Sequence, residues 1–417
     1  MDINMFLGHI QSYQNRTAVF DGTKTCTYNE LLNQILRKVD VYKQTDVSTY
    51  LLVSNNTLDI VTTFLAMVAA EKSVFMVSHE DKENWAEHNL PGINVDTEPD
   101  QYGAFAIQGS TPAGKIFLLT SGTTKAKRAV QLRFSQIVEN GVNALSIYPL
   151  NEEDTVLSIL PLNHVFGLVS LLASLISGVQ IGIGIKAANT LLRCSNASLV
   201  LHSVPRVLLE LLPMISRSAA RQILSAGATL SPNIAEQFHQ HGIVVYEAYG
   251  MTETAGAVAI GPFGQMKILA HMDAFAFDGE IYVGGTLMEG YWGGNLMEEC
   301  LATGDLGEVL PWDILRITGR KKELLVFDNG EKLHPTVLED VVYRKCTNIT
   351  ECEAYQTSVG QLEVDVYTPY KEIDLRSLLE QVNLEVPHYA RINRITQRNT
   401  PFPHTESGKL KRRIPNG

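Results

Sequence analysis

The sequence predicts an α/β protein: a large N-terminal domain of helix-covered, mostly parallel sheets with a small antiparallel β unit, followed by a small α+β domain. The first indication is a repeated order of apolar strand, loop and amphipathic helix, which is typical of parallel sheet covered by helices. The second is a change to strand and turn around Gly279 to Trp292. The third is a more charged composition after Gly319, which predicts two domains, 1–318 and 319–417.

Hydrophobic periodicity and helix-start signals predict the individual elements of the first domain. Ser231 followed by Pro232 is a typical helix start, with a hydroxyl cap and proline in the first turn. The pattern predicts helices over 32–42 and 57–70, and strands over 49–54, 73–77, 221–227 and 243–250.

A stretch without formal charge, residues 155–185, is long enough to cross a bilayer. Pro161, Asn163 and several glycines interrupt it, and its pattern changes from strand to loop to helix to strand. A buried α/β unit accounts for these breaks better than a lipid-facing helix does, so we expect no membrane insertion.

Composition excludes several other classes of protein. Hydrophobic residues make up 45% and charged residues 19% of the 417 residues, which excludes wholesale disorder. The net charge of −11 argues against a general nucleic-acid binder. The five cysteines are scattered without zinc-ligand spacing, and the N-terminus has an early Asp2 and no basic run, so we expect a reducing, cytoplasmic location.

The segment KIFLLTSGTTKAKRAVQL has the residues of a polyphosphate site. Hydroxyls and backbone N–H groups can donate to phosphate oxygens, glycine permits close approach, and cations balance charge. A solvated hairpin tip would account equally well for this segment taken alone, and the Walker A pattern is absent. The residues after the strand are Thr120, Ser121, Gly122, Thr123, Thr124, Lys125, Ala126, Lys127 and Arg128.

Three further segments carry single candidate residues. Glu253 follows the strand-like YEAYG and could hold Mg²⁺ against a phosphate. Asp305 in LATGDLGE could accept from ribose hydroxyls, and Lys409 in PHTESGKLKRR could neutralise a developing negative charge. Taken one at a time, a surface turn acid or a frayed basic tail explains each of them as well.

The order of the segments is more informative than any one of them. KIFLLTSGTTKAKRAV, LPLNHVFG, LSAGATLS, YGMTE, GEIYVGG…GYWGG, TGDLG, TGRKKELLVFDNGEKLHPTVLE and PHTESGKLKRR together resemble the adenylate-forming superfamily, in its AMP-forming acyl- and aryl-CoA synthetase branch. The resemblance runs from about Thr27 to Lys411. It implies activation of a carboxylic acid with ATP and Mg²⁺ to an acyl-adenylate and pyrophosphate, then transfer of the acyl group to a thiol.

The resemblance also implies residue roles. Thr120 to Thr124 would surround the β- and γ-phosphates with Arg128 as a cation, Thr252 would contact the α-phosphate, and Glu253 would bind Mg²⁺. Lys409 would bridge the substrate carboxylate and the α-phosphate, Lys322 would be the hinge of a mobile C-terminal lid domain, and Asn329 and Gly330 would approach the thiol. The remaining nucleotide contacts would be Gly227, Ala228 and Tyr249 at the adenine, and Asp305 and Arg320 at the ribose.

Two local features refine this expectation. The family loop usually continues as Gly-x-Pro-Lys-Gly, whereas this chain has Lys125-Ala126-Lys127-Arg128-Ala129, which indicates an altered but phosphate-competent loop. The segment LPLNHVFGLVS has no acid to pair with a substrate ammonium, so an aryl or aliphatic acid is expected. His164 resembles a gate beside the acyl site, and Gly256 would leave room for a ring or chain; a core histidine is the alternative for His164.

Three functions fit the sequence. The first is an acid:thiol ligase that makes acyl- or aryl-CoA. The second is an adenylating enzyme that loads a carrier-protein phosphopantetheine or an amine. The third is a nucleotide-binding relative without turnover, which the retained Glu253, Asp305, Arg320 and Lys409 disfavour.

Overall fold

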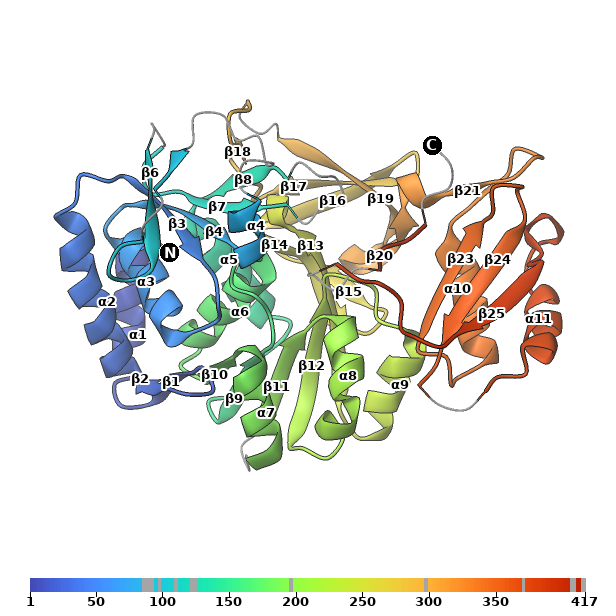
Figure 1. Cartoon of the computed structure of the whole chain (residues 1–417), viewed down its shortest axis with the longest axis horizontal. Coiled ribbons are helices and arrows are strands. Elements are labelled where there is room, and N and C mark those ends of the chain that lie inside the picture. Colours follow the sequence, from blue (N-terminus) through green and yellow to red (C-terminus); the bar gives the residue numbers. More distant parts are fainter. Residues whose placement is uncertain are drawn as a thin grey trace.

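A 13-stranded sheet and a 7-stranded sheet form the larger part of the molecule, and a small α+β unit lies at one end (Figure 1). The structure is a computed structural model. It describes residues 1–84, 94–96, 99–108, 112–120, 127–194, 198–295, 299–369, 372–405 and 410–413.

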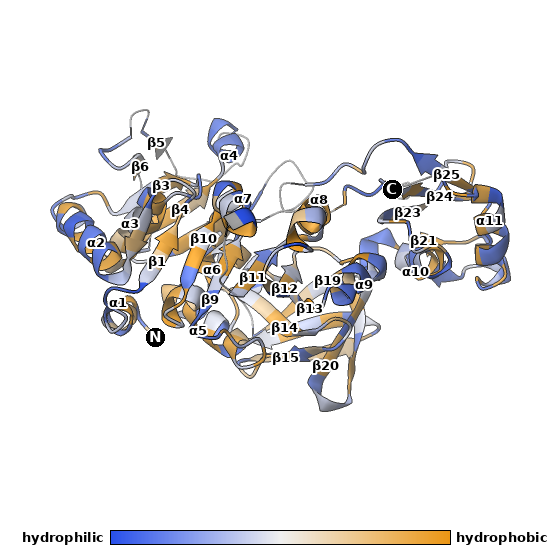
Figure 2. Ribbon diagram, turned by 90° about the horizontal axis from the view of Figure 1, so that it is seen from below, coloured by the Kyte–Doolittle hydropathy of each residue, from blue (hydrophilic) through white to orange (hydrophobic). Residues whose placement is uncertain are grey.

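The parallel part of the 13-stranded sheet corresponds to the predicted strand–helix alternation. Its inner strands are buried along most of their length, as expected for a sheet covered by helices on two sides, and Figure 2 shows their apolar stretches in orange. The parallel strands, in spatial order, are β1 (Thr17–Phe20), β10 (Gln180–Ile183), β9 (Asp154–Ser158), β11 (Ser198–Ser203), β12 (Ala220–Ala226) and β13 (Val244–Met251), and β2 (Thr25–Thr27) pairs antiparallel with β1.

Beyond β13 the same sheet continues in antiparallel strands, so the predicted antiparallel unit is joined edge to edge with the parallel part. The junction lies at Met251–Gly256, where the chain turns back on itself. The strands follow in the order β14 (Gly256–Pro262), β15 (Met266–Ile268), β20 (Ile314–Arg320), β19 (Cys300–Leu310), β17 (Glu280–Gly285) and β16 (Met272–Phe277).

The 7-stranded sheet packs against the first sheet through shared helices. One apolar cluster includes Val156 and Val200 of the first sheet and Val74 and Leu118 of the second, with α5 and α6 between them. The strands are β18 (Gly290–Tyr291), β8 (Ala129–Leu132), β7 (Ile116–Leu119), β4 (Ser73–Val77), β3 (Thr49–Val53), β6 (Ala104–Gln108) and β5 (Asn94–Val95).

The helix predicted over 57–70 and the one predicted to start at Ser231-Pro232 begin within a residue of the expected position, whereas the one predicted over 32–42 begins four residues earlier, at Tyr28. Ser231 occupies the N-cap position of α9, but its hydroxyl makes no cap bond, so that part of the prediction is wrong. The helices are α1 (Ile3–Gln11), α2 (Tyr28–Lys43), α3 (Leu58–Ala69), α4 (His79–Glu83), α5 (Phe134–Leu145), α6 (Val165–Ile176), α7 (Gly184–Cys194), α8 (Pro205–Ile215) and α9 (Pro232–Gln240).

The charge-free stretch 155–185 folds as the predicted buried unit. It forms β9, a loop, α6 and β10, and α6 is buried nearly all round because it lies between the two sheets. Within the described residues, no helix is long and apolar enough to span a bilayer.

The small unit has a core of its own, formed by residues between Leu325 and Ile395. It contacts α9 of the large part through Asn233, whose side-chain amide donates to the carbonyls of Tyr343, Cys346 and Ile349, each over 3.1 Å. Its elements are α10 (Pro335–Lys345), α11 (Leu375–Asn383), the sheet of β23 (Glu351–Gln356), β24 (Leu362–Tyr367) and β25 (Arg394–Arg398), and the pair β21 (Leu325–Val326) and β22 (Lys332–Leu333).

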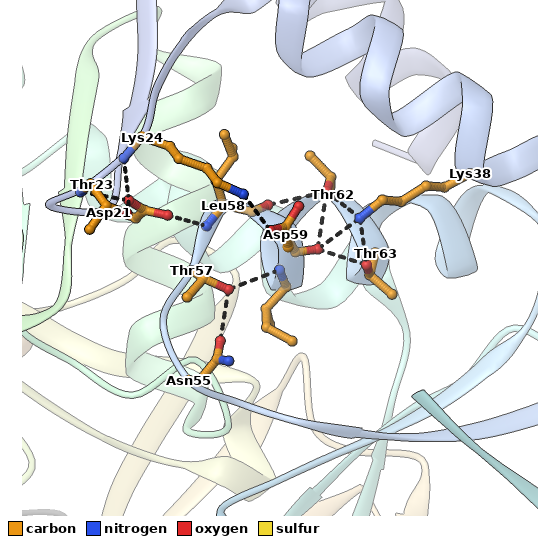
Figure 3. A network of polar contacts seen from close by, with 11 residues as sticks. Asp21, Thr23, Lys24, Lys38, Asn55, Thr57, Leu58, Asp59, Thr62 and Thr63 are labelled. Atoms are coloured by element: carbon orange, nitrogen blue, oxygen red, sulfur yellow. Dashed lines mark hydrogen bonds and ion pairs between the residues drawn. The ribbon is translucent and has the colours of Figure 1, made fainter. Parts of the chain in front are cut away.

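A polar network anchors the N-terminal turn to α3 (Figure 3). Asp21 accepts hydrogen bonds from the backbone and hydroxyl of Thr23, from Lys24 N and from Leu58 N, at 2.7 to 3.0 Å. Burial alone would raise the pKa of Asp21, but these hydrogen bonds outweigh it and lower the pKa to about 2. The buried ammonium of Lys38 joins α2 to α3 by donating to Thr62 and Thr63, 2.8 Å each.

We expect the Asp21→Ala variant to lose about 2 kcal/mol of unfolding free energy at pH 7, since the orphaned donors are partly buried. A carboxylate with a lowered pKa stabilises the fold above its unfolded pKa, so the deficit should shrink as the pH falls from about 4 toward 2. Denaturant titrations at several pH values measure this. The exposed Asp40 on α2 provides the control Asp40→Ala, and a deficit that stays constant down to pH 2 would contradict the assignment.

Candidate active site

Three of the predicted site residues meet where β13 ends beside β19 and β20. Tyr249 Oη donates to Asp305 Oδ2 over 2.6 Å, and Arg320 Nε lies 2.7 Å from Asp305 Oδ1. Asp305 and Arg320 are direct partners in the pairing of β19 with β20. Burial, and then the nearby Asp305 carboxylate, raise the pKa of Tyr249. A carboxylate has about four lone-pair sites, so a group of this kind can accept from a diol as well as from protein donors.

Gly227 and Ala228 lie beside this group. They follow Ala226, the last residue of β12, and Ala226 pairs with Ala248 of β13. The turn after β12 and Tyr249 therefore occupy neighbouring positions at the carboxyl ends of these two strands. Gly227 has a φ of +84°, a conformation that favours glycine and lets the chain turn sharply at the strand end. Ligands of open α/β sheets bind at such carboxyl ends of the strands.

A second polar group lies four residues further along the chain from Tyr249. Glu253, in the 3₁₀ turn Thr252–Thr254, accepts a hydrogen bond from Tyr291 Oη over 3.0 Å. The Arg128 guanidinium carbon lies 3.8 Å from the centre of the Tyr291 ring, in cation–π contact. Burial, and then the Glu253 carboxylate, raise the pKa of Tyr291. The structure therefore brings the predicted cation and the predicted carboxylate together through Tyr291.

Tyr291 is a site residue that the sequence reasoning missed, although its segment GYWGG is one of the motifs. What places Tyr291 in the site is the pairing of β18 with β8, in which Tyr291 lies opposite Val130. Val130 is two residues after Arg128 in the chain. No local pattern in the sequence indicates this pairing, because the two segments are far apart along the chain.

The base of the predicted phosphate loop is described, but its tip is not. Thr120 and Arg128 join the two arms of the base: Thr120 N donates to Arg128 O over 2.9 Å, and Arg128 N donates to Thr120 Oγ1 over 3.2 Å. The tip residues Ser121, Gly122, Thr123, Thr124, Lys125 and Ala126 lie outside the described residues.

Lys127 at this base is held by a buried carboxylate. Its Nζ lies 2.5 Å from Oδ1 of Asp81 on α4, and the Ser78 hydroxyl donates to the other carboxylate oxygen over 3.0 Å. Asp81 is only 3% exposed, so this pair is largely shielded from water. The sequence treats Lys127 as a charge for phosphate, whereas the structure shows it bound to the protein.

The proposed hinge is bridged by side chains from the small unit. Lys322 lies exposed in the 3₁₀ turn Lys321–Glu323. Just before it in the chain, Arg320 N donates to His334 Nε2 over 2.8 Å, and Thr318 O accepts from the Thr336 hydroxyl over 2.7 Å. Burial, and then the Arg412 charge, lower the pKa of His334 to about 4, so at neutral pH the imidazole can accept from Arg320.

The C-terminal tail is anchored immediately after the predicted catalytic lysine. Arg412 Nη1 and Nη2 lie 2.5 and 2.8 Å from the two carboxylate oxygens of Glu339, and its Nε lies 3.3 Å from Glu323. Arg413 pairs with Asp365 and lies over the ring of Tyr355. Lys409 itself lies outside the described residues.

The wall expected to face the acid is built by the start of α6. His164 is the N-cap residue of α6, and Phe166 stacks on His202 of β11 with ring centres 6.3 Å apart. The expectation of free space at Gly256 is wrong. A Cβ at Gly256 would come within 2.3 Å of Asn140 Oδ1, because the amide of the fully buried Asn140 bonds the backbone of Ala257 there.

Comparison with known proteins agrees with this arrangement. The family model described as "AMP-binding enzyme" matches residues 115–292. The long-chain-fatty-acid–CoA ligase FadD15 of Mycobacterium bovis is 28% identical over 60% of this chain and 53% of its own length. The chain thus matches about half the length of that relative. The 2-succinylbenzoate–CoA ligase of Staphylococcus epidermidis is 22% identical over 97% of this chain and 95% of its own.

Solved structures share the fold over nearly the whole chain. A variant of E. coli MenE with bound OSB-AMS gives a TM-score of 0.78 at 21% identity, covering 94% of this chain and 95% of that one. ATP-bound MatB from Rhodopseudomonas palustris gives 0.80 at 18% identity, covering 99% and 97%.

The motifs, the match of residues 115–292 to the AMP-binding model and the shared two-part fold agree on one class of protein: the chain is similar to the adenylate-forming superfamily of AMP-binding enzymes. The relatives named above are a long-chain-fatty-acid–CoA ligase and a 2-succinylbenzoate–CoA ligase, so the comparisons support the resemblance of the motifs to the acyl- and aryl-CoA ligase branch.

Proposed function

We propose that the protein activates a non-amino carboxylic acid with ATP to an acyl-adenylate, with release of pyrophosphate, and transfers the acyl group to CoA. The observation that carries this proposal is the position of two polar groups along β13 and the turn after it. The group Tyr249–Asp305–Arg320 is suited to a ribose, and the group Glu253–Tyr291–Arg128 is suited to a metal-bound phosphate.

The residue roles follow from that position. Thr120 to Thr124 and Arg128 would bind the β- and γ-phosphates, Thr252 the α-phosphate, and Gly227 and Ala228 with Tyr249 the adenine. Among the described residues, no group of three or more His, Cys, Asp or Glu side chains is placed to hold a metal. A single carboxylate such as that of Glu253 fits a Mg²⁺ that takes its other ligands from phosphate and water, as Mg²⁺ usually does.

The small unit would act as a lid over this site. Its separate core begins at Leu325 and supports a boundary near residue 318, although β20 of the large sheet runs on to Arg320. Lys322 would be the hinge, and Asn329 and Gly330 would lie near the incoming thiol. Lys409 would complete the first half-reaction as the cation between the substrate carboxylate and the α-phosphate. Rotation about the hinge would then withdraw it for the second.

The acid is proposed to be aryl or aliphatic because the α6 wall, with His164 and Phe166, carries no charge. The relatives act on long-chain fatty acids and on 2-succinylbenzoate, which are acids of these two kinds. A carrier-protein phosphopantetheine or an amine is the alternative acceptor. A cytoplasmic location is proposed with this activity, and the described cysteines Cys26, Cys300, Cys346 and Cys352 are free thiols.

Product analysis tests the function. The protein is incubated with ATP, Mg²⁺, CoA and pools of acids, and AMP and acyl-CoA are measured by mass spectrometry, with a phosphopantetheinylated carrier protein as parallel acceptor. Equal amounts of AMP and acyl-CoA are expected. Formation of acylated carrier protein without acyl-CoA would show that the carrier, and not CoA, is the acyl acceptor. Binding of ATP without formation of AMP would favour a nucleotide-binding relative without turnover.

The ion pair Lys127–Asp81 predicts a positioning role in this function. We expect Lys127→Met to raise the KM for ATP about tenfold with less effect on kcat, because the phosphate loop would lose the anchor at its base. Asp81→Asn should act in the same direction, since it weakens the same anchor. Initial rates at varied ATP concentration measure both.

The neighbouring Lys82 provides the control, since its ammonium lies over the Phe105 ring and not at the loop base. Lys82→Met should leave the KM for ATP unchanged. If Lys127 instead binds phosphate directly, Asp81→Asn would free it and lower the KM, which would overturn the anchoring role.

A further inference from the structure

A buried histidine lies on the face of β11 that is covered by α6. His202 is 3% exposed, and its Nδ1 lies 2.6 Å from the hydroxyl of Ser170 on α6, which is 2% exposed. The ring stacks on Phe166 and meets Tyr148 at a tilt, with ring centres 5.4 Å apart. Burial lowers the pKa of His202 to about 3, so the imidazole is neutral at physiological pH.

The other ring nitrogen is unsatisfied. Within the part of the chain that the structure describes, His202 Nε2 has no hydrogen-bond partner, and neither has the hydroxyl of Ser158. Ser158 is fully buried on β9, and it is the direct register partner of His202 across the β9–β11 pair, so both side chains stand on the same face of the sheet. Leaving two buried polar groups unpaired costs stability, and such groups usually await a ligand or water.

Sheet register relates this pair to the nucleotide group. His202 pairs with Leu224, Leu224 pairs with Tyr246, and Tyr249 lies three residues further along β13. At about 3.3 Å per residue, the unsatisfied pair lies roughly 10 Å before Tyr249, measured along the strands only. Because side chains alternate along a strand, the odd offset places the Tyr249 side chain on the other face of the sheet, so the register relates the two groups in depth and not by a shared face. On the face of His202, Phe166 near the N-terminus of α6 stacks on the imidazole, so the unsatisfied pair lies against the wall that is expected to face the acid.

We propose that His202, oriented by Ser170 and assisted by Ser158, is a specificity-determining residue that binds an uncharged oxygen at the far end of the acid. The substrate class is then an aryl or aliphatic acid with a distal hydroxyl or carbonyl, and not a plain hydrocarbon acid. The proposal rests on the adenylating function proposed above. A hydroxyl suits either tautomer of His202, because it can both donate and accept. A charged substituent is disfavoured by the neutral, aromatic surroundings.

Matched pairs of acids test this proposal in acid-dependent ATP–pyrophosphate exchange. The probes are 3-(4-hydroxyphenyl)propanoate against 3-phenylpropanoate, and 7-hydroxyheptanoate against heptanoate. We expect the wild type to favour the oxygenated member of at least one pair by about tenfold or more in kcat/KM. His202→Leu should bring that preference close to unity by lowering kcat/KM for the oxygenated acid only.

Two serines of α6 provide a matched comparison. Ser170→Ala, which removes the group that orients His202, should weaken the preference. Ser174→Ala should not, because Ser174, also buried and one turn further along, bonds only the carbonyl of Ser170 among the contacts seen. ATP binding by each variant, followed by calorimetry, shows that the nucleotide site is folded.

The outcomes separate the two proposals. Exchange with all four acids without preference, or a preference that survives in both His202→Leu and Ser170→Ala, would overturn the role of His202 and leave adenylation intact. Absence of exchange with these acids and with pools of other acids would overturn adenylation and the role of His202 together.

Discussion

The Lys409→Ala variant is expected to lose acyl-adenylate formation by at least about a hundredfold, while still forming thioester from supplied acyl-adenylate. The reason is that the lysine is proposed to stabilise charge only in the first half-reaction and to be withdrawn by lid rotation before the second. Single-turnover assays of each half-reaction, started from acid and ATP or from acyl-adenylate and CoA, measure the two rates separately.

The tail offers a control for this variant. Lys411 is exposed, and its backbone N–H donates to Pro403 O over 2.9 Å, a bond that an alanine would retain. Lys411→Ala should therefore leave both half-reactions nearly unchanged. Equal loss of both half-reactions in Lys409→Ala would contradict the assigned role and indicate a general effect on the fold.

The Arg412→Met variant is expected to destabilise the small unit by about 3 kcal/mol or more, because it leaves the carboxylate of Glu339 buried without its partner. Glu339 is 4% exposed and accepts two hydrogen bonds from Arg412. The same change should release the tail that follows Lys409, so adenylation should fall as well. Hydrogen exchange of the small unit measures the first effect, and pyrophosphate exchange measures the second.

Two further variants make this prediction specific. Replacing both partners, as Arg412→Met with Glu339→Leu, should restore part of the stability, because it removes the buried charge of Glu339. The restoration is partial, since Ala354 N loses its acceptor Glu339 Oε1 and Glu323 loses its contact with Arg412. Arg376→Met should cost less than about 0.5 kcal/mol, since Arg376 and Glu380 form an exposed pair on α11. If Arg412→Met is as mild as Arg376→Met, the tail is not anchored in this way.

Several features of the fold could be predicted because their causes are local. The predicted division of the charge-free stretch 155–185 into strand, loop, helix and strand is confirmed, since Pro161 and the glycines limit each element. The sequence around Gly279 to Trp292 predicts antiparallel structure, but not that these strands continue the parallel sheet, because sheet order depends on distant pairings. The hydroxyl bond expected of Ser231 is not made, although the helix begins there.

In the candidate site too, residues in local motifs could be predicted, and residues whose roles depend on tertiary contacts could not. Glu253, Asp305 and Arg320 stand out because each lies in a segment that resembles a motif of the superfamily. Tyr291 and Asp81 could not be predicted, since their functions depend on contacts with Arg128 and Lys127 that only tertiary structure creates. The space expected at Gly256 is absent for a similar reason: whether glycine leaves a gap depends on its neighbours, and here the Asn140 amide fills it.

Acid-dependent ATP–pyrophosphate exchange, with separate pools of aryl acids, fatty acids and amino acids, tests adenylation and the choice of acid in one experiment. We expect exchange with the aryl or the fatty-acid pool and none with amino acids, because the α6 wall has no carboxylate to pair with an ammonium group. Exchange with amino acids alone would contradict the choice of acid. Silence with every pool, in protein that still binds ATP, would contradict adenylation itself.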